Sequence, residues 1–308
     1  MTTSQNPLAK FFRQPAIYTT LPSNGDWYPE GALVFDNEKE LAVYPMTAKD
    51  EMTMNTPDAL LNGESTINVI RSCVPGIKDP WMMPVLDLDS IMIAIRIATY
   101  GHMMDINVTI PNTEDKVVYN VDLRTAGDKI DKTPFDGYVP AGNVSFKIKP
   151  MSYRQLTNLQ LRTFEQQRII TQVIDTNELN ASQKQEKFAE IFGHMTNLTL
   201  ANMKESILEV TAEGQTITDR VYIEEFVDNM DGATADKIKK RLDAQKDLGR
   251  IQPITITPTK EQIEKGAPAS FDAPISMDNS NFFVSRSYLS RLLNLKNILK
   301  NLKTQTKI

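Results

Sequence analysis

The side chains best suited to catalysis or metal binding are few and scattered in this sequence. The 308 residues include one cysteine, Cys73, and two histidines, His102 and His194. A zinc site needs three or four Cys, His or carboxylate ligands at workable spacing, and no CxxC, HxH or HExxH arrangement occurs. A Cys–His nucleophilic pair stays open because such pairs meet in space. Cys73 lies beside Val69 and Val74, however, which favours a buried small hydrophobe. We expect no metal and no cofactor.

Asp87 and Asp89 are the best acidic candidates for a metal site or for general acid–base catalysis. Two carboxylates at this spacing share a face only in a strand, whereas these two precede the apolar run from Ser90 to Tyr100. A helix start explains them without catalysis, with Asp89 as the N-cap and Asp87 just outside the helix. We favour the capping role.

Arg96 is an unusual residue because it lies inside this apolar run. Burying an unpaired guanidinium is costly, so we expect a structural ion pair, with anion binding as the less favoured alternative. The acidic residues near enough in the sequence to serve as partners are Asp50, Glu51, Asp87 and Asp105.

Composition and missing motifs exclude several classes of protein. The sequence has no GxSxG elbow and no GxGxxG or GxxxxGK[ST] phosphate loop. Its formal net charge of -5 gives no reason to expect nucleic-acid binding. The most apolar window, residues 91–98, is far shorter than a membrane span and contains Arg96. A single cysteine and no signal-peptide pattern predict a protein made or assembled in the cytosol.

Turn and cap signals predict short elements in the first half of the chain. Residues 1–45 are expected to be extended and turn-rich, with a hairpin around residues 36–39. Thr47 and Asp50 then resemble a capping box in which Asp replaces the usual Glu.

Three further helices are expected to follow. Thr56-Pro57 is an N-cap and first-turn proline, and Gly63 ends the short helix that they begin. Ser65 is expected to cap the next helix, which stops near Pro75. Gly101 is the expected end of the apolar helix that follows Asp89, and this helix should be buried because it has almost no polar face.

The rest of the chain changes from strand to helix periodicity. Within residues 46–150, the segments DINVTI, KVVYNVDL and NVSFKIKP alternate with period two and predict one antiparallel sheet, with a loop before the third. Residues 151–280 predict a helical domain that includes separate helices at SQKQEKFAEIFGHM and TLANMKESILEV, then a strand at IQPITITP. The predicted fold class is α+β, with a β-rich N-terminal half around a buried short-helix module and a mainly helical C-terminal half.

Residues 281–308 form a basic amphipathic helical pattern that contains no acidic residue. Three roles are open for it: docking on a partner, which we favour, packing on the protein's own acidic surface, or lying on an anionic membrane, which is the least favoured. The residues expected to dock are Arg286, Arg291, Leu292, Leu295, Lys296 and Leu299.

Several separated blocks resemble one known family. LPSNGDWYP, ELAVYPMTAKDEMTMNTPDALLNG, VIRSCVPGIKDPW and DLDSIMIAIRIATYG occur in that order within residues 21–105. Together they resemble the baseplate hub family of contractile-tailed bacteriophages of the T-even type. The structural signature carried by these blocks comprises Thr47, Asp50, Thr56, Pro57, Gly63, Asp87, Asp89, Arg96 and Gly101.

The resemblance implies a non-enzymatic structural or assembly component of the phage tail baseplate hub. Its partners would be other tail or hub proteins, and its location the host cytoplasm during assembly and the virion baseplate if it is retained. One alternative is a transient assembly chaperone that binds the tape-measure protein or another hub subunit. The least favoured class is a hydrolase that uses Cys73 or the Asp87/Asp89 pair.

Overall fold

The structure, a computed structural model, describes residues 6–54, 63–113, 115–175, 180–275 and 282. Helices and antiparallel strands are mixed along the chain, which confirms the α+β class. The helices and 3-10 turns are η1 (Ala9–Phe11), α1 (Ala48–Met54), α3 (Glu64–Cys73), η2 (Pro80–Met82), η3 (Val85–Asp87), α4 (Leu88–Tyr100), α5 (Leu123–Asp128), α6 (Tyr153–Asp175), α7 (Ala181–Ser206), α8 (Arg220–Asn229), α9 (Gly232–Ala244) and α10 (Lys260–Glu264). The strands are β1 (Ile17–Thr20), β2 (Glu40–Val43), β3 (Met103–Thr109), β4 (Lys116–Asp122), β5 (Tyr138–Ala141), β6 (Val144–Ile148), β7 (Ile207–Ala212), β8 (Gln215–Ile217), β9 (Ile254–Ile256) and β10 (Phe271–Ala273).

The first hydrophobic core surrounds α4. Residues 91–96 of this helix are all buried, as its lack of a polar face predicts. The helix packs against α3, α5 and the β1–β2 sheet. Phe282, near the end of the chain, is fully buried in the same core. Burial on every side of α4 makes it the central element of this half of the molecule.

The second hydrophobic core lies under a four-stranded antiparallel sheet with the strand order β5-β6-β7-β8. Phe146 of β6 and Ile207 of β7 are buried there beside Ile223 of α8 and Ile238 of α9. The second core therefore joins residues near 140 to residues beyond 200.

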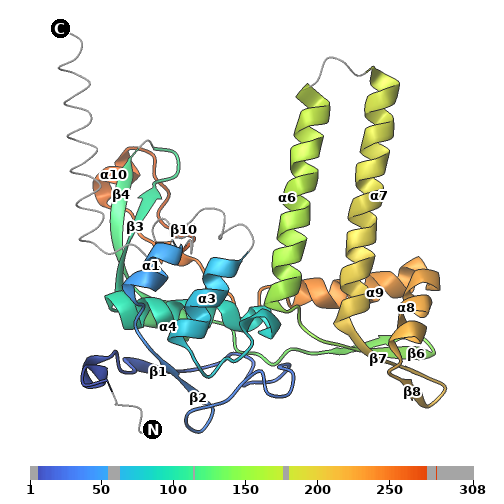
Figure 1. The fold of residues 1–308 in the computed structure, drawn as a ribbon. Helices are drawn as coiled ribbons and strands as arrows, with labels where there is room; N and C mark the ends of the chain where they lie inside the picture. Colours follow the sequence, from blue (N-terminus) through green and yellow to red (C-terminus); the bar gives the residue numbers. More distant parts are fainter. Residues whose placement is uncertain (1–5, 55–62, 114, 176–179, 276–281, 283–308) are drawn as a thin grey trace.

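Helices α6 and α7 form an antiparallel pair that projects from the body of the protein (Figure 1). Their lower ends reach the two cores. Tyr153 of α6 stacks on Trp81 at a ring distance of 5.8 Å, and its N–H donates to the carbonyl of Met83, a first-core residue, at 2.8 Å. Met203 of α7 is buried in the second core. The rest of the pair extends away from both cores, and we call it the α6–α7 hairpin.

Two expected strand pairings are wrong. The three strands expected to form one sheet are divided: β3 pairs with β4, whereas β6 pairs with β5 and β7. The hairpin expected around residues 36–39 is reduced to a single isolated bridge between Asn37 and Glu40, and β2 pairs instead with β1. Period-two alternation identifies a strand but does not select its partner.

Three segments have a different element from the one expected. The two helices expected around residues 182–210 are one continuous α7, and the apolar run from Ile207 is the strand β7 rather than the end of a helix. The expected loop before β6 contains α5 and β5. Short apolar runs are ambiguous between helix and strand, and here the pairing with β6 decides.

Candidate docking surface

Asp87 is buried and accepts hydrogen bonds from the N-terminal loop instead of capping α4. It occupies the N-cap position of α4 without making a side-chain cap. Its carboxylate accepts hydrogen bonds from the Ser23 backbone N–H at 2.8 Å, the Ser23 hydroxyl at 2.6 Å and the Tyr28 hydroxyl at 3.0 Å. Burial raises the pKa of Asp87 to about 6, although these hydrogen bonds oppose the shift. The carboxylate therefore holds the N-terminal loop against α4.

Asp89 ties a more distant segment to the same end of α4. It accepts the Ile251 backbone N–H at 2.9 Å and lies 3.5 Å from the Arg250 guanidinium. Burial raises its pKa, and the hydrogen bond from Ile251 and the charge of Arg250 oppose the shift. The expectation that Asp89 caps the helix is therefore wrong. Both carboxylates therefore accept hydrogen bonds from other segments of the fold.

The Thr47–Asp50 capping box is confirmed and belongs to a larger cluster. The Thr47 backbone N–H donates to Asp50 at 2.8 Å, and the Asp50 N–H donates to the Thr47 hydroxyl at 3.2 Å. Asp50 also accepts the Ser72 hydroxyl at 2.9 Å. Arg13 lies 3.5 Å from Asp50 and donates to both the carbonyl and the hydroxyl oxygen of Ser72. This cluster joins the N-terminal segment, α1 and α3.

Arg96 has no ion pair among the described residues, so the expected partnership with a carboxylate is wrong. Its guanidinium donates to the Gly101 carbonyl at 3.1 Å and lies 4.7 Å from the centre of the Tyr100 ring. The Tyr100 hydroxyl in turn donates to Glu51 at 2.9 Å. A ring face and a carbonyl oxygen stabilise the buried cation in place of an anion.

The Cys73 thiol lies in a buried environment that disfavours the reactive thiolate form. Cys73 is fully buried, and its pKa is raised to about 12 by burial and by the charge of Asp50, against the opposing effect of Arg13. The thiol is therefore protonated and unreactive at neutral pH. His194 lies on the projecting α7, 4.0 Å from Glu190. The described part of the chain contains no cluster of three His, Cys, Asp or Glu residues able to hold a metal ion.

The two signature glycines within the described residues have distinct roles. Gly101 ends α4 with φ +83°, and its N–H donates to the Ile97 carbonyl, as expected. Gly63 directly precedes α3 with φ +75°, and a Cβ there would crowd Thr157 at the root of α6. Ser65 is not the cap that was expected, because it is buried inside α3. Thr56, Pro57 and the six expected docking residues near the C-terminus lie outside the described residues.

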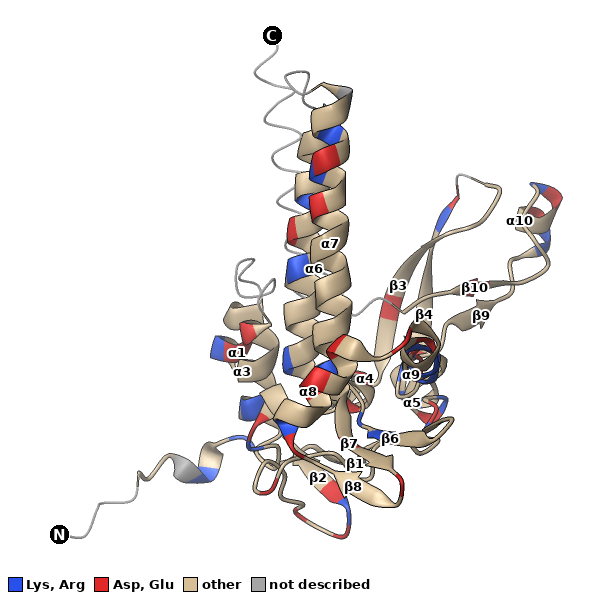
Figure 2. Ribbon diagram, turned by 90° about the vertical axis from the view of Figure 1, so that its right-hand side faces the viewer, with Lys and Arg blue, Asp and Glu red and all other residues tan. Residues whose placement is uncertain are grey.

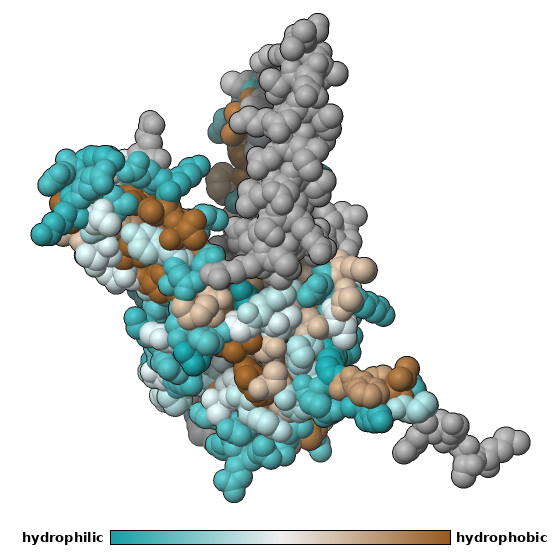
Figure 3. Space-filling view, turned by 90° about the vertical axis from the view of Figure 1, so that its left-hand side faces the viewer, coloured by the Kyte–Doolittle hydropathy of each residue, from teal (hydrophilic) through white to brown (hydrophobic). Residues whose placement is uncertain are grey.

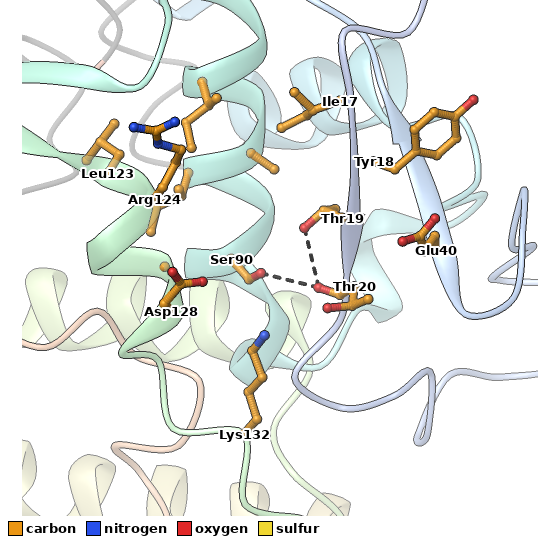
Figure 4. A pocket seen from close by; sticks show the side chains of 14 residues that line it. Ile17, Tyr18, Thr19, Thr20, Glu40, Ser90, Leu123, Arg124, Asp128 and Lys132 are labelled. Carbon is orange, nitrogen blue, oxygen red and sulfur yellow. Dashed lines mark hydrogen bonds between the residues drawn. The ribbon is translucent and has the colours of Figure 1, made fainter.

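A groove of about 360 Å³ lies between β1, α4 and α5 (Figure 4). The Ser90 hydroxyl points across it toward the Thr20 carbonyl at 3.5 Å. Arg124 on its rim is paired with Asp122 at 2.7 Å. The ionisable residues that line this groove are Glu40, Arg124, Asp128 and Lys132.

Large apolar side chains are exposed on the α6–α7 hairpin. Phe164 of α6 and Phe192 of α7 are 51% and 63% exposed, and Ile174 and Met195 are exposed as well. Near the tip, Lys184 Nζ donates to the Ile174 carbonyl at 3.0 Å and holds the helices together. Exposed apolar residues grouped on one projecting element are typical of an interaction site.

A second exposed apolar group lies at the N-terminus. Leu8, Phe11 and Phe12 are all exposed on a segment that extends from the body (Figure 2) and whose apolar side chains are visible in Figure 3. We call residues 8–12 the N-terminal knob. The Arg13 cluster fixes its base to α1 and α3. Neither apolar surface was predicted from the sequence, in which exposed and buried apolar side chains carry the same signal.

The model of a known family, the T4 bacteriophage base plate protein, matches residues 17–264. The chain belongs to this family. The match extends the resemblance seen over residues 21–105 across both cores and the α6–α7 hairpin. No curated protein and no solved structure matched the chain.

Membership makes the chain a structural protein of the phage tail baseplate, where its neighbours are other baseplate proteins. A baseplate protein needs surfaces for those neighbours. The hairpin lies inside the matched residues, whereas the N-terminal knob lies outside them. No described helix of the baseplate protein is long and apolar enough to cross a membrane.

Proposed function

We propose that this baseplate protein is a structural or assembly component of the central hub and that it acts through protein–protein contacts without catalysing a reaction. The polar groups that first suggested chemistry support this proposal. Asp87, Asp89 and Asp50 are each occupied in joining distant segments of the chain, and the Cys73 thiol is buried.

The observation that carries the proposal is the α6–α7 hairpin with its exposed Phe164 and Phe192. Fully covering a phenylalanine that is otherwise exposed stabilises a contact by about 1.5–3 kcal/mol. Two such residues, with Ile174 and Met195 beside them, can supply the central anchors of an interface. The basic and apolar residues Arg286, Arg291, Leu292, Leu295, Lys296 and Leu299 near the C-terminus are proposed as a second contact site for a hub or tape-measure protein.

Mass spectrometry of purified virions and of tail-assembly intermediates tests this function. A hub subunit should be present in the virion in a fixed ratio to other baseplate proteins. Presence only in intermediates, together with the tape-measure protein or a hub subunit, would instead identify a transient assembly chaperone. Absence from both preparations would contradict the proposal.

The variant Phe192→Asp tests whether the α6–α7 hairpin carries this function. A phage carrying the variant should yield fewer complete baseplates, while the variant protein itself stays folded because residue 192 is exposed. Tyr222→Asp is a matched control, since Tyr222 of α8 is an aromatic residue that is also 63% exposed. Normal baseplate yield with Phe192→Asp would show that the hairpin does not carry the function.

A further inference from the structure

Within the described residues, β1 pairs with a single strand, β2, in a two-stranded antiparallel sheet. Tyr18 lies opposite Ala42, and Thr20 lies opposite Glu40. Along an antiparallel pair, residues alternate between exchanging both backbone hydrogen bonds with the opposite residue and turning these groups away from it. The bonds that β2 makes elsewhere therefore show which residues of β1 turn away.

The outward-facing groups of β2 are bonded to the loop that precedes this strand. The Asp36 N–H donates to the Glu40 carbonyl at 3.0 Å, and the Ala42 N–H donates to the Asp36 carboxylate at 2.8 Å. Glu40 and Ala42 therefore direct these groups away from β1. Since opposite residues behave alike, Thr20 and Tyr18 direct their backbone groups away from β2.

These backbone groups of β1 face the groove between β1, α4 and α5. All four residues of β1 line the groove, and the Thr20 carbonyl is turned across it toward the Ser90 hydroxyl at 3.5 Å (Figure 4). Within the described part of the chain, the N–H and carbonyl of Tyr18 and the N–H of Thr20 have no hydrogen-bond partner. An edge with such unpaired groups is a template for a further strand.

The dimensions of the groove suit one extended segment. Its other wall is apolar and is formed by Ala94 and Ile97 of α4 with Leu123 of α5. These two helices leave a groove of about 360 Å³ and exclude the edge of a second folded sheet. A strand rises about 3.3 Å per residue, so the amides of Tyr18 and Thr20 are about 6.6 Å apart, which matches alternate residues of a paired strand.

We propose that this groove binds an extended segment of a neighbouring baseplate protein, which pairs with β1 as a third strand. The segment bonds to the N–H and carbonyl of Tyr18 and to the N–H of Thr20, and it ends near Ser90. One of its apolar side chains packs against Ile97. In strand addition, backbone hydrogen bonds supply affinity, and contacts of alternate side chains supply specificity. The groove involves neither helix of the α6–α7 hairpin.

Hydrogen exchange of single backbone amides tests this pairing. In the free full-length chain, the amides of Tyr18 and Thr20 should exchange rapidly, whereas that of Thr19, which faces β2, should be protected. In purified baseplates or assembly intermediates that contain the chain, Tyr18 and Thr20 should become at least about tenfold more protected. Protection equal to that of Thr19 in the free chain, or no gain on assembly, would overturn the inference.

A matched pair of variants at Tyr18 isolates its backbone N–H. Tyr18→Pro removes this N–H, which β2 does not use, and edge positions of this kind tolerate proline. Tyr18→Ala keeps the N–H and removes the ring. Phage carrying Tyr18→Pro should yield at least about tenfold fewer complete baseplates than phage carrying Tyr18→Ala. Equal yields from two variants that circular dichroism shows to be folded would overturn the inference, and hydrogen exchange decides it if the proline variant does not fold.

Photo-cross-linking identifies the source of the segment. A benzoylphenylalanine in place of Arg124, on the rim of the groove, should cross-link in assembled baseplates to a different baseplate protein. Cross-linking to a second copy of this chain would overturn the choice of partner. A normal baseplate yield with Phe192→Asp contradicts the proposed role of the hairpin and leaves this inference standing, so the two can fail separately.

Discussion

At the scale of single residues, burial and local partners decide what each ionisable group does. Asp87 has the hydrogen-bond donors that an ionised carboxylate needs, yet burial still raises its pKa to about 6. Arg96 is buried without an acidic partner among the described residues and is stabilised by Tyr100 and the Gly101 carbonyl. These groups hold the fold together, and their charge state therefore affects its stability.

The raised pKa of Asp87 predicts a pH-dependent stability. The folded state retains this proton more tightly than the unfolded state, whose value is near 3.8. The stabilisation is complete below about pH 4 and is lost as the pH rises through about 6. It amounts to about 3 kcal/mol. Urea unfolding between pH 4 and 7 should show this decrease in the free energy of unfolding.

The variant Asp87→Asn should remove that component of the pH dependence, because an amide does not titrate. Asp247→Asn, at an exposed position, should preserve it. An unchanged pH profile in Asp87→Asn would assign the dependence to another group.

At the scale of elements, a few connecting residues set how the helices and strands meet. The segment between α9 and β9 crosses the start of α4, where the Gly249 N–H donates to the Asp131 carbonyl at 3.0 Å and Arg250 lies beside Asp89. Gly249 has φ +71°, and a Cβ there would overlap the Leu86 carbonyl. Glycine is required at this crossing both for its conformation and for its size.

Gly249→Ala should therefore lower the free energy of unfolding by about 3 kcal/mol or more, which combines the strain of positive φ with a backbone clash. Gly214→Ala is the matched control, since Gly214 has φ +78° but open space where a Cβ would stand. It should cost only about 1 kcal/mol. Equal losses in urea unfolding would show that the close approach to Leu86 is unimportant.

At the scale of the whole molecule, chain segments far apart in sequence complete each core. Phe282 and Ile275 join a first core built mainly from residues before 131, while β5 and β6 join a second core built mainly from residues beyond 200. Each core therefore combines chain segments that are far apart in the sequence.

The variant Phe282→Ala tests how much Phe282 contributes to the stability of the first core. Removing a fully buried phenylalanine ring should lower the free energy of unfolding by about 3–5 kcal/mol. Ile263→Ala, at an exposed position of α10, should cost less than about 1 kcal/mol. A small effect at Phe282, measured by denaturant unfolding, would show that the chain end contributes little to the first core.

The sequence by itself determined the features whose signals lie within a few residues. The Thr47–Asp50 capping box, the end of α4 at Gly101, the burial of α4 and the α+β class all follow from local spacing and hydrophobic pattern. The ordered blocks between residues 21 and 105 also indicated the family that the match over residues 17–264 shows.

Only the tertiary structure decided which distant groups meet. Asp87 binds Ser23, 64 residues away, and β6 pairs with β7 across the entire hairpin. The exposure of Phe164 and Phe192 likewise depends on where the body ends and the projecting helices begin. Local pattern shows that a side chain is apolar or charged, but its partner is set by packing between segments whose separation along the chain carries no such signal.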